Sequence, residues 1–139
     1  MPEIMPLPLP VTLMVAGLMA FWLIYLQAAV IRIRRSHGIS MGDGGDEACA
    51  RAVRAHGNAA ETVPIFLILL ALVELQGAPL WALVFTGTMF TAGRLLHGLH
   101  FMRRRKGLLL RVLGMALTLT ATALVGAGAL YYGASALTG

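Results

Sequence analysis

Charged side chains are scarce in this sequence of 139 residues. Asp, Glu, Lys and Arg together make up 12%, about half of their usual share in soluble proteins. Hydrophobic residues make up 58%, above the roughly 45–50% that is typical of soluble globular chains. The shortage of charge therefore disfavours a soluble globular protein and favours a membrane protein with several spanning helices.

Cysteine is almost absent as well. The single Cys49 excludes an internal disulfide framework, and we interpret it as a small core residue rather than a reactive thiol. The sequence has no HxxxH, CxxC or paired-carboxylate pattern of the kind that holds a metal, no glycine-rich phosphate loop and no GxSxG nucleophile elbow. We therefore expect no metal site.

The formal net charge of +5 raises the question of nucleic-acid binding. The basic residues, however, lie between long apolar runs, where a duplex could not reach past the lipid headgroups. This distribution argues against a nucleic-acid partner.

Four apolar segments predict four helices. The first covers about residues 8–33. Its uncharged run 11–31 is longer than the apolar core of a signal peptide, and no basic stretch precedes it. This segment therefore predicts a spanning helix. The third and fourth segments cover about residues 79–101 and 108–132. They contain the charge-free runs 75–93 and 112–139, long enough to cross a hydrocarbon core of about 30 Å.

The second segment is different, because only residues 62–73 are free of charge. At about 1.5 Å per residue, these residues would cover roughly 18 Å of a helix, which is too short to cross a bilayer. The helix can span only if it begins near Asp46, a suitable N-cap, and takes a polar stretch partly into the membrane. Polar side chains at that depth must face protein or water.

The fold that follows is all-α, a single four-helix membrane domain over residues 1–139. Every basic residue lies in or beside the first or the third connection, and the positive-inside rule then places these two loops in the cytoplasm and both termini outside. We interpret the run 103–106 as a topology signal at the headgroup surface. The eleven basic residues are Arg32, Arg34, Arg35, Arg51, Arg54, Arg94, Arg103, Arg104, Arg105, Lys106 and Arg111.

The polar stretch RAVRAHGNAAETVP, residues 51–64, opens the second segment. At about 100° per residue, its polar side chains fall within an arc of about 80° on one helix face, and small residues flank that arc. His56 points elsewhere. The polar face consists of Arg51, Arg54, Asn58 and Glu61, and the flanking small residues are Ala52, Ala55 and Ala59.

Two explanations of this polar face remain open. It could form a structural network between helices, with Glu61 paired to Arg54 or Arg94. It could instead bind a ligand, because arginines, an amide and a carboxylate suit a small zwitterion with an excess of carboxylates. The third segment offers a matching face in GRLLHGLHF, where Arg94, His97 and Phe101 share an arc of about 60°.

These motifs resemble a known family. RAVRAHGNAAETVP is similar to the RxxRAHxNxxE signature of the membrane-associated proteins in eicosanoid and glutathione metabolism (MAPEG), and GRLLH is similar to their GRxxH element. The GDGGD turn and RVLGMALT resemble the small bacterial branch of the family. The resemblance covers about residues 15–125. It implies a homotrimer of four-helix subunits in the bacterial inner membrane, with glutathione bound between subunits near the cytoplasmic side.

The resemblance also implies residue roles. Arg111 takes the place of the family arginine that stabilises the glutathione thiolate, which makes it the candidate catalytic residue. The implied glutathione-binding residues are Arg32, Arg54, His56, Asn58, Glu61 and Arg94.

Two functions follow. The first is a glutathione transferase or peroxidase that acts on lipophilic electrophiles delivered through the bilayer. The second is a non-enzymatic oligomeric membrane protein, or a protein that binds a small anion, on the same scaffold. Phe101 and Met115 stand where family members carry tyrosines, which favours the second. A drug or ion transporter is a weaker third interpretation, because Glu61 lies among arginines rather than in an apolar helix.

Overall fold

Four helices account for nearly all of the described chain. The computed structural model describes residues 9–102 and 108–138, and there the regular elements are α1 (Pro10–Ser36), α2 (Glu47–Leu75), α3 (Leu80–Met102) and α4 (Leu109–Thr138). This confirms the all-α, four-helix prediction, with boundaries within three residues except at the end of α4. That helix continues six residues past the expected end at Tyr132.

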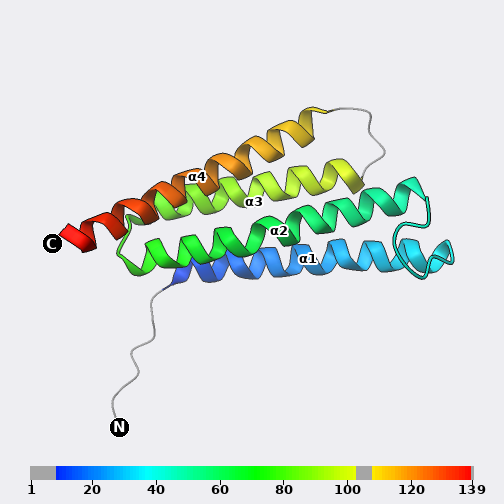
Figure 1. Cartoon of the computed structure of the whole chain (residues 1–139), viewed down its shortest axis with the longest axis horizontal. Helices are drawn as coiled ribbons and strands as arrows, with labels where there is room; N and C mark the ends of the chain where they lie inside the picture. Colours follow the sequence, from blue (N-terminus) through cyan, green and yellow to red (C-terminus); the bar gives the residue numbers. More distant parts are fainter. Residues whose placement is uncertain (1–8, 103–107, 139) are drawn as a thin grey trace, which may run out of the picture.

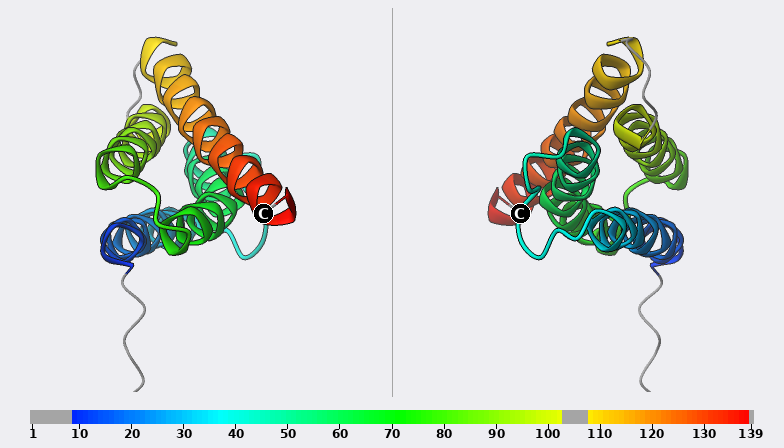
Figure 2. Two further views of the ribbon diagram at one scale, coloured as in Figure 1. Left: turned by 90° about the vertical axis from the view of Figure 1, so that its left-hand side faces the viewer. Right: turned by 90° about the vertical axis from the view of Figure 1, so that its right-hand side faces the viewer.

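The helices run up and down side by side (Figure 1). The start of α1, the α2–α3 turn and the end of α4 lie at one end of the bundle, and the α1–α2 loop lies at the other. Seen along the bundle, α4 crosses the other helices obliquely (Figure 2). The α1–α2 loop, the end of α3 and the start of α4 therefore lie at the same end, as the topology prediction requires; the run 103–106 itself lies outside the described residues.

The boundaries of α2 follow from local chemistry. The Asp46 carboxylate accepts a hydrogen bond of 2.7 Å from the backbone N–H of Cys49, which is N-capping. At the other end, Gly77 adopts a φ of 78°. The N–H of Gly77 donates to the carbonyl of Glu74, and the N–H of Ala78 donates to that of Val73. This is a Schellman motif, which needs a left-handed residue and so favours glycine.

The first turn of α1 is completed by a residue from α2. Leu9 at the N-cap offers no side-chain hydrogen bond. Instead, the backbone N–H groups of Val11 and Thr12 donate to the two carboxylate oxygens of Glu74, at 2.9 and 2.8 Å. Glu74 is only 8% exposed. Its charge therefore lies against the positive end of the α1 dipole, at the end of the bundle opposite to the basic loops.

Three of the described helices, α1, α2 and α4, are long and apolar enough to cross a membrane. Many large apolar side chains point away from the bundle, as expected for lipid contact. α2, which begins directly after its N-cap Asp46 as expected, is among the three helices. α3 is not one of these three candidate spans, because Arg94, His97 and His100 lower its mean hydropathy. This differs from the prediction of four spanning helices from the sequence. The outward side chains include Leu13, Phe21, Ile24, Ile68, Leu80, Leu109 and Leu130.

The core joins α2 to its neighbours. The rings of Phe66 and Phe90 stack at 3.8 Å between centroids, and both are fully buried. Nearer the basic end, Ala55 and Ala59 pack against Leu26 of α1. The small residues that flank the polar face of α2 thus lie against the bundle, and this turns the polar face outward.

Candidate functional site

Arg94 is the residue around which α2, α3 and α4 meet. Its side chain is 1% exposed. The Nε group donates to the Thr118 hydroxyl at 2.8 Å, and Nη1 donates to the Asn58 carbonyl at 3.2 Å and to the Thr62 hydroxyl at 3.1 Å. On the remaining edge, Nη2 has the Met115 sulfur at 3.9 Å. One guanidinium therefore ties three helices together and keeps one edge without an oxygen acceptor in the described chain.

The ion pair that the sequence offered as a structural explanation is not formed. Within residues 9–102 and 108–138, the ion pairs are His37 with Asp46 and Arg51 with Glu47. The suggested pairing of Glu61 with Arg54 or Arg94 is thus wrong for the single chain. The reason is geometric: Glu61 is exposed on α2, whereas Arg94 reaches the backbone and hydroxyls of the same helix from its buried side.

A close approach of two glycines positions α4 beside Arg94. A Cβ atom on Gly93 would lie 2.8 Å from the carbonyl oxygen of Gly114 and 2.7 Å from the Thr118 hydroxyl. A Cβ atom on Gly114 would lie 2.6 Å from the backbone nitrogen of His97. These distances leave no room for a side chain, so the helices can pack this closely only with glycine at both positions.

A second cluster follows one turn further along α3. The ring centroids of His97 and Phe101 lie 5.1 Å apart, and the guanidinium carbon of Arg111 lies 5.7 Å from the Phe101 centroid. This is within the range of a cation–π contact. The structure therefore brings Arg111, exposed on the outside of α4, to the helix face that carries Arg94 and His97.

The polar residues of α2 form a surface of the single chain. Arg54 and Glu61 are exposed, and His56 and Asn58 are half-buried. Arg32, near the end of α1, is also exposed. Arg32 and Arg54 form no hydrogen bond or ion pair within the described residues. The structure therefore joins Arg94 to Asn58 through its backbone carbonyl and brings Arg111 to Phe101, and it leaves Arg32, Arg54 and Glu61 on the surface.

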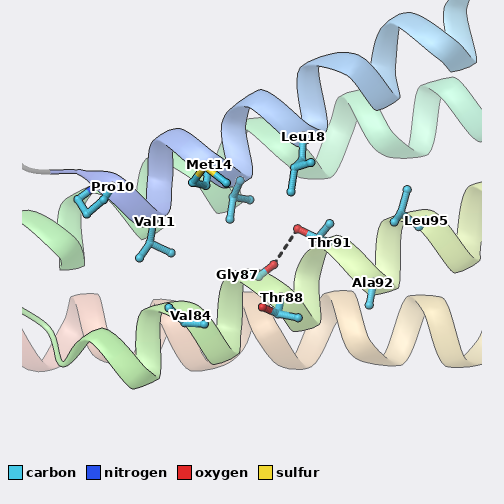
Figure 3. A pocket seen from close by; sticks show the side chains of 11 residues that line it. Pro10, Val11, Met14, Leu18, Val84, Gly87, Thr88, Thr91, Ala92 and Leu95 are labelled. Atoms are coloured by element: carbon cyan, nitrogen blue, oxygen red, sulfur yellow. Dashed lines mark hydrogen bonds between the residues drawn. The ribbon is translucent and has the colours of Figure 1, made fainter.

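A cavity of a different character lies elsewhere in the described chain. It is an apolar groove of about 540 Å³ between α1 and α3, with Met14 and Leu18 on one wall and Val84 and Leu95 on the other (Figure 3). Its hydroxyl at Thr91 already donates to the carbonyl of Gly87. The groove has no charged side chain in its lining, so it offers nothing that would recognise a charged peptide.

Sequence reasoning missed Thr118, Gly93 and Gly114. Gly114 and Thr118 form a small-xxx-small pattern, which marks close helix packing in membranes and could have identified this face of α4. Glu74 was also missed, because a lone carboxylate at a helix end gives no signal of the distant backbone that it caps. In the described chain, no group of three or more His, Cys, Asp or Glu residues could hold a metal ion.

Comparison with known proteins agrees with the motifs. A model of the MAPEG family matches residues 12–131. The chain is 37% identical over 103 residues to the inner membrane protein YecN of Escherichia coli strain K12, covering 70% of this chain and 79% of that protein. The YecN of Escherichia coli O6:H1 strain CFT073 matches equally well. The name of these relatives gives a location and no reaction. The resemblance of the helix motifs is thereby confirmed, and the chain is an integral membrane protein that belongs to the MAPEG family.

Proposed function

We propose that this protein binds glutathione between subunits and uses its thiolate against lipophilic electrophiles, as a transferase or peroxidase. One observation carries the proposal: a polar helix face with Arg54 and Glu61 lies exposed beside the buried Arg94, whose Nη2 edge lacks an oxygen acceptor in the described chain. Buried or membrane-embedded charge of this kind needs a partner.

Glutathione matches that need chemically. It carries two carboxylates, one ammonium group and a thiol. Arginines bind carboxylates through paired hydrogen bonds, and the Glu61 carboxylate can accept from the ammonium. Asn58 and His56, half-buried on the same helix, add neutral polar groups. The family to which the chain belongs includes proteins of glutathione metabolism, which supports this ligand over other small zwitterions.

Catalysis would depend on Arg111. A free thiol has a pKa of about 8.5 and is only slightly ionised at neutral pH, and a nearby guanidinium favours the thiolate. Arg111 lies over Phe101, on the side of α3 that carries His97, so a thiol near this ring would feel its charge. A lipophilic second substrate would reach the thiolate from the bilayer.

The assembly proposed is a homotrimer. The single chain leaves Arg32, Arg54 and Glu61 on its surface, and a neighbouring subunit would supply the missing wall. We place it in the bacterial inner membrane, following its YecN relatives. α3 lies alongside three candidate spans, so we propose four crossings, with both termini outside.

A non-enzymatic role on the same scaffold is the second candidate. A specific observation favours it: where family members carry tyrosines, this chain has Phe101 and Met115. The Met115 sulfur lies 3.9 Å from Nη2 of Arg94, so a weak acceptor stands near the ligand edge of the guanidinium. Such a protein would bind glutathione or a similar anion without activating it.

Calorimetric titration of the purified protein in mild detergent tests the proposal. Glutathione and an S-alkyl glutathione should both bind, and the ethyl ester that masks both carboxylates should not. The ultraviolet absorbance of bound thiolate then separates the two candidates, since only the enzyme should form thiolate below pH 8. Absence of glutathione binding would reject both glutathione-dependent functions. Native mass spectrometry tests the trimer, and a monomer would contradict it.

A further inference from the structure

The donor groups of Arg94 are unevenly used. Nε and Nη1 together donate to three oxygen atoms, on Thr118, Asn58 and Thr62, whereas the partner of Nη2 in the described chain is the Met115 sulfur at 3.9 Å, a weak acceptor. A guanidinium is planar, so fixing Nε and Nη1 also fixes the direction in which Nη2 points. The direction of the Nη2 edge, which faces no oxygen acceptor in the described chain, therefore depends on the oxygens that hold Nε and Nη1.

Thr118 is the most constrained of these oxygens. It is 1% exposed, and its hydroxyl donates to the carbonyl of Gly114 at 2.8 Å. Because the single hydroxyl proton is used there, the oxygen can only accept from Nε of Arg94. The Gly93–Gly114 close approach brings this oxygen within reach of Nε, which has no second acceptor in the described chain.

We infer that Thr118 is a positioning residue for ligand binding: it turns the guanidinium of Arg94 so that the Nη2 edge faces a carboxylate of the bound peptide. The inference depends on the proposed function in one respect, the identity of the ligand as glutathione. Without the Thr118 hydroxyl, Nε would be a buried donor with no partner, and the guanidinium would turn to find another acceptor.

The chain offers a matched control. Thr122 lies one turn further along α4, and its hydroxyl donates to the carbonyl of Thr118 at 2.8 Å, the same local bond. It makes no hydrogen bond to Arg94. Thr122→Val therefore removes the same group from the same helix without touching the guanidinium. Thr118→Ser keeps the hydroxyl, while Thr118→Val and the smaller Thr118→Ala both remove it.

The first experiment needs no ligand. Purified variants in detergent are treated with phenylglyoxal, which reacts with free guanidinium groups, and the modification of Arg94 is timed by peptide mass spectrometry. We expect Arg94 to react at least about fivefold faster in Thr118→Val and Thr118→Ala than in the wild type, and at the wild-type rate in Thr118→Ser and Thr122→Val. Equal rates in all variants would overturn the inference.

The second experiment measures glutathione affinity. Thr118→Val should weaken binding about tenfold, equivalent to about 1.4 kcal/mol, and Thr118→Ser should restore it to within about threefold of the wild type. Wild-type affinity in a folded Thr118→Val would overturn the inference and leave the proposed function intact. A wild type that does not bind glutathione would reject the proposed ligand, and the phenylglyoxal rates would still decide the positioning of Arg94.

Discussion

The guanidinium carbon of Arg111 lies 5.7 Å from the ring centroid of Phe101, so α4 presents its charge to the ring at the end of α3. If Arg111 stabilises the glutathione thiolate, Arg111→Ala should still bind glutathione. The thiolate absorbance of the bound ligand should appear only at higher pH, and turnover with a model electrophile should fall about 10–100-fold, or roughly 1.4–2.7 kcal/mol. An equal thiolate titration and an equal rate in the mutant would remove Arg111 from catalysis.

Phe101 should act through Arg111. Phe101→Leu removes the ring and its attraction for the guanidinium, worth about 0.5–1 kcal/mol at an exposed site, so turnover should fall less than about fivefold. Phe101→Tyr keeps the ring and should keep the rate. The double variant Phe101→Leu/Arg111→Ala should turn over as fast as Arg111→Ala alone, and stopped-flow kinetics would measure both rates. A further loss of rate in the double variant would mean that the ring acts independently of Arg111.

The polar face of α2 should recognise the charged groups of the ligand. Arg54→Ala or Glu61→Gln should each weaken glutathione binding by about 1.5–3 kcal/mol, the range for hydrogen bonds to charged groups. Arg35→Ala is the control, since it removes an exposed positive charge from the last turn of α1, outside the proposed site. Calorimetry should show near wild-type affinity for this control. Unchanged affinity in a folded Arg54→Ala would place the site elsewhere.

Acid should loosen the start of α2. The pKa of Asp46 is lowered chiefly by the hydrogen bond from the backbone of Cys49, with a further contribution from His37. A carboxyl group whose pKa is lowered by folding stabilises the fold above its unfolded pKa of about 3.9 and loses that effect as the pH falls through the folded value. The protection of the Cys49 amide against hydrogen exchange, measured relative to the intrinsic exchange rate at each pH, should therefore fall below about pH 4 in the wild type, and Asp46→Asn, which cannot titrate, should lack this pH dependence.

Glu74 should be required for stability rather than for ligand binding. Glu74→Ala leaves the N–H groups of Val11 and Thr12 without their acceptor and should lower the free energy of unfolding by about 1.5–3 kcal/mol. Glu74→Gln keeps one acceptor oxygen and should lose less. Thermal unfolding in detergent measures both changes, and the glutathione affinity of the folded fraction should stay unchanged. A stable Glu74→Ala would contradict the role of this contact.

Local signals in the sequence predicted the helices well. The assignment of Asp46 as the N-cap of α2 depends on neighbours within a few residues, and the structure confirms it. Helical periodicity also placed Arg94, His97 and Phe101 on one face of α3.

Contacts between distant helices were beyond the same reasoning. A helical wheel gives the face on which Arg94 lies but not how far α3 is rotated or shifted against α2. The pairing with Glu61, one of the two explanations left open, is therefore not found, and the bonds to Thr62 and Thr118 were not foreseen. The exposure of Arg32 and Arg54 on the surface of the single chain likewise could not be derived from a helical wheel. A single chain cannot supply the partner that their proposed role requires.

The bond from Glu74 to the start of α1 also bears on how the protein enters its membrane. Glu74, the acceptor for the backbone N–H groups of Val11 and Thr12, is synthesised 63 and 62 residues after these donors, so α1 leaves the ribosome with its first turn unsatisfied. Burying those groups in hydrocarbon alone is unfavourable. α1 should therefore reach its final depth only when α2 joins it, and the two should insert as a helical hairpin, so that a nascent chain arrested before residue 74 leaves α1 poorly anchored at the membrane surface.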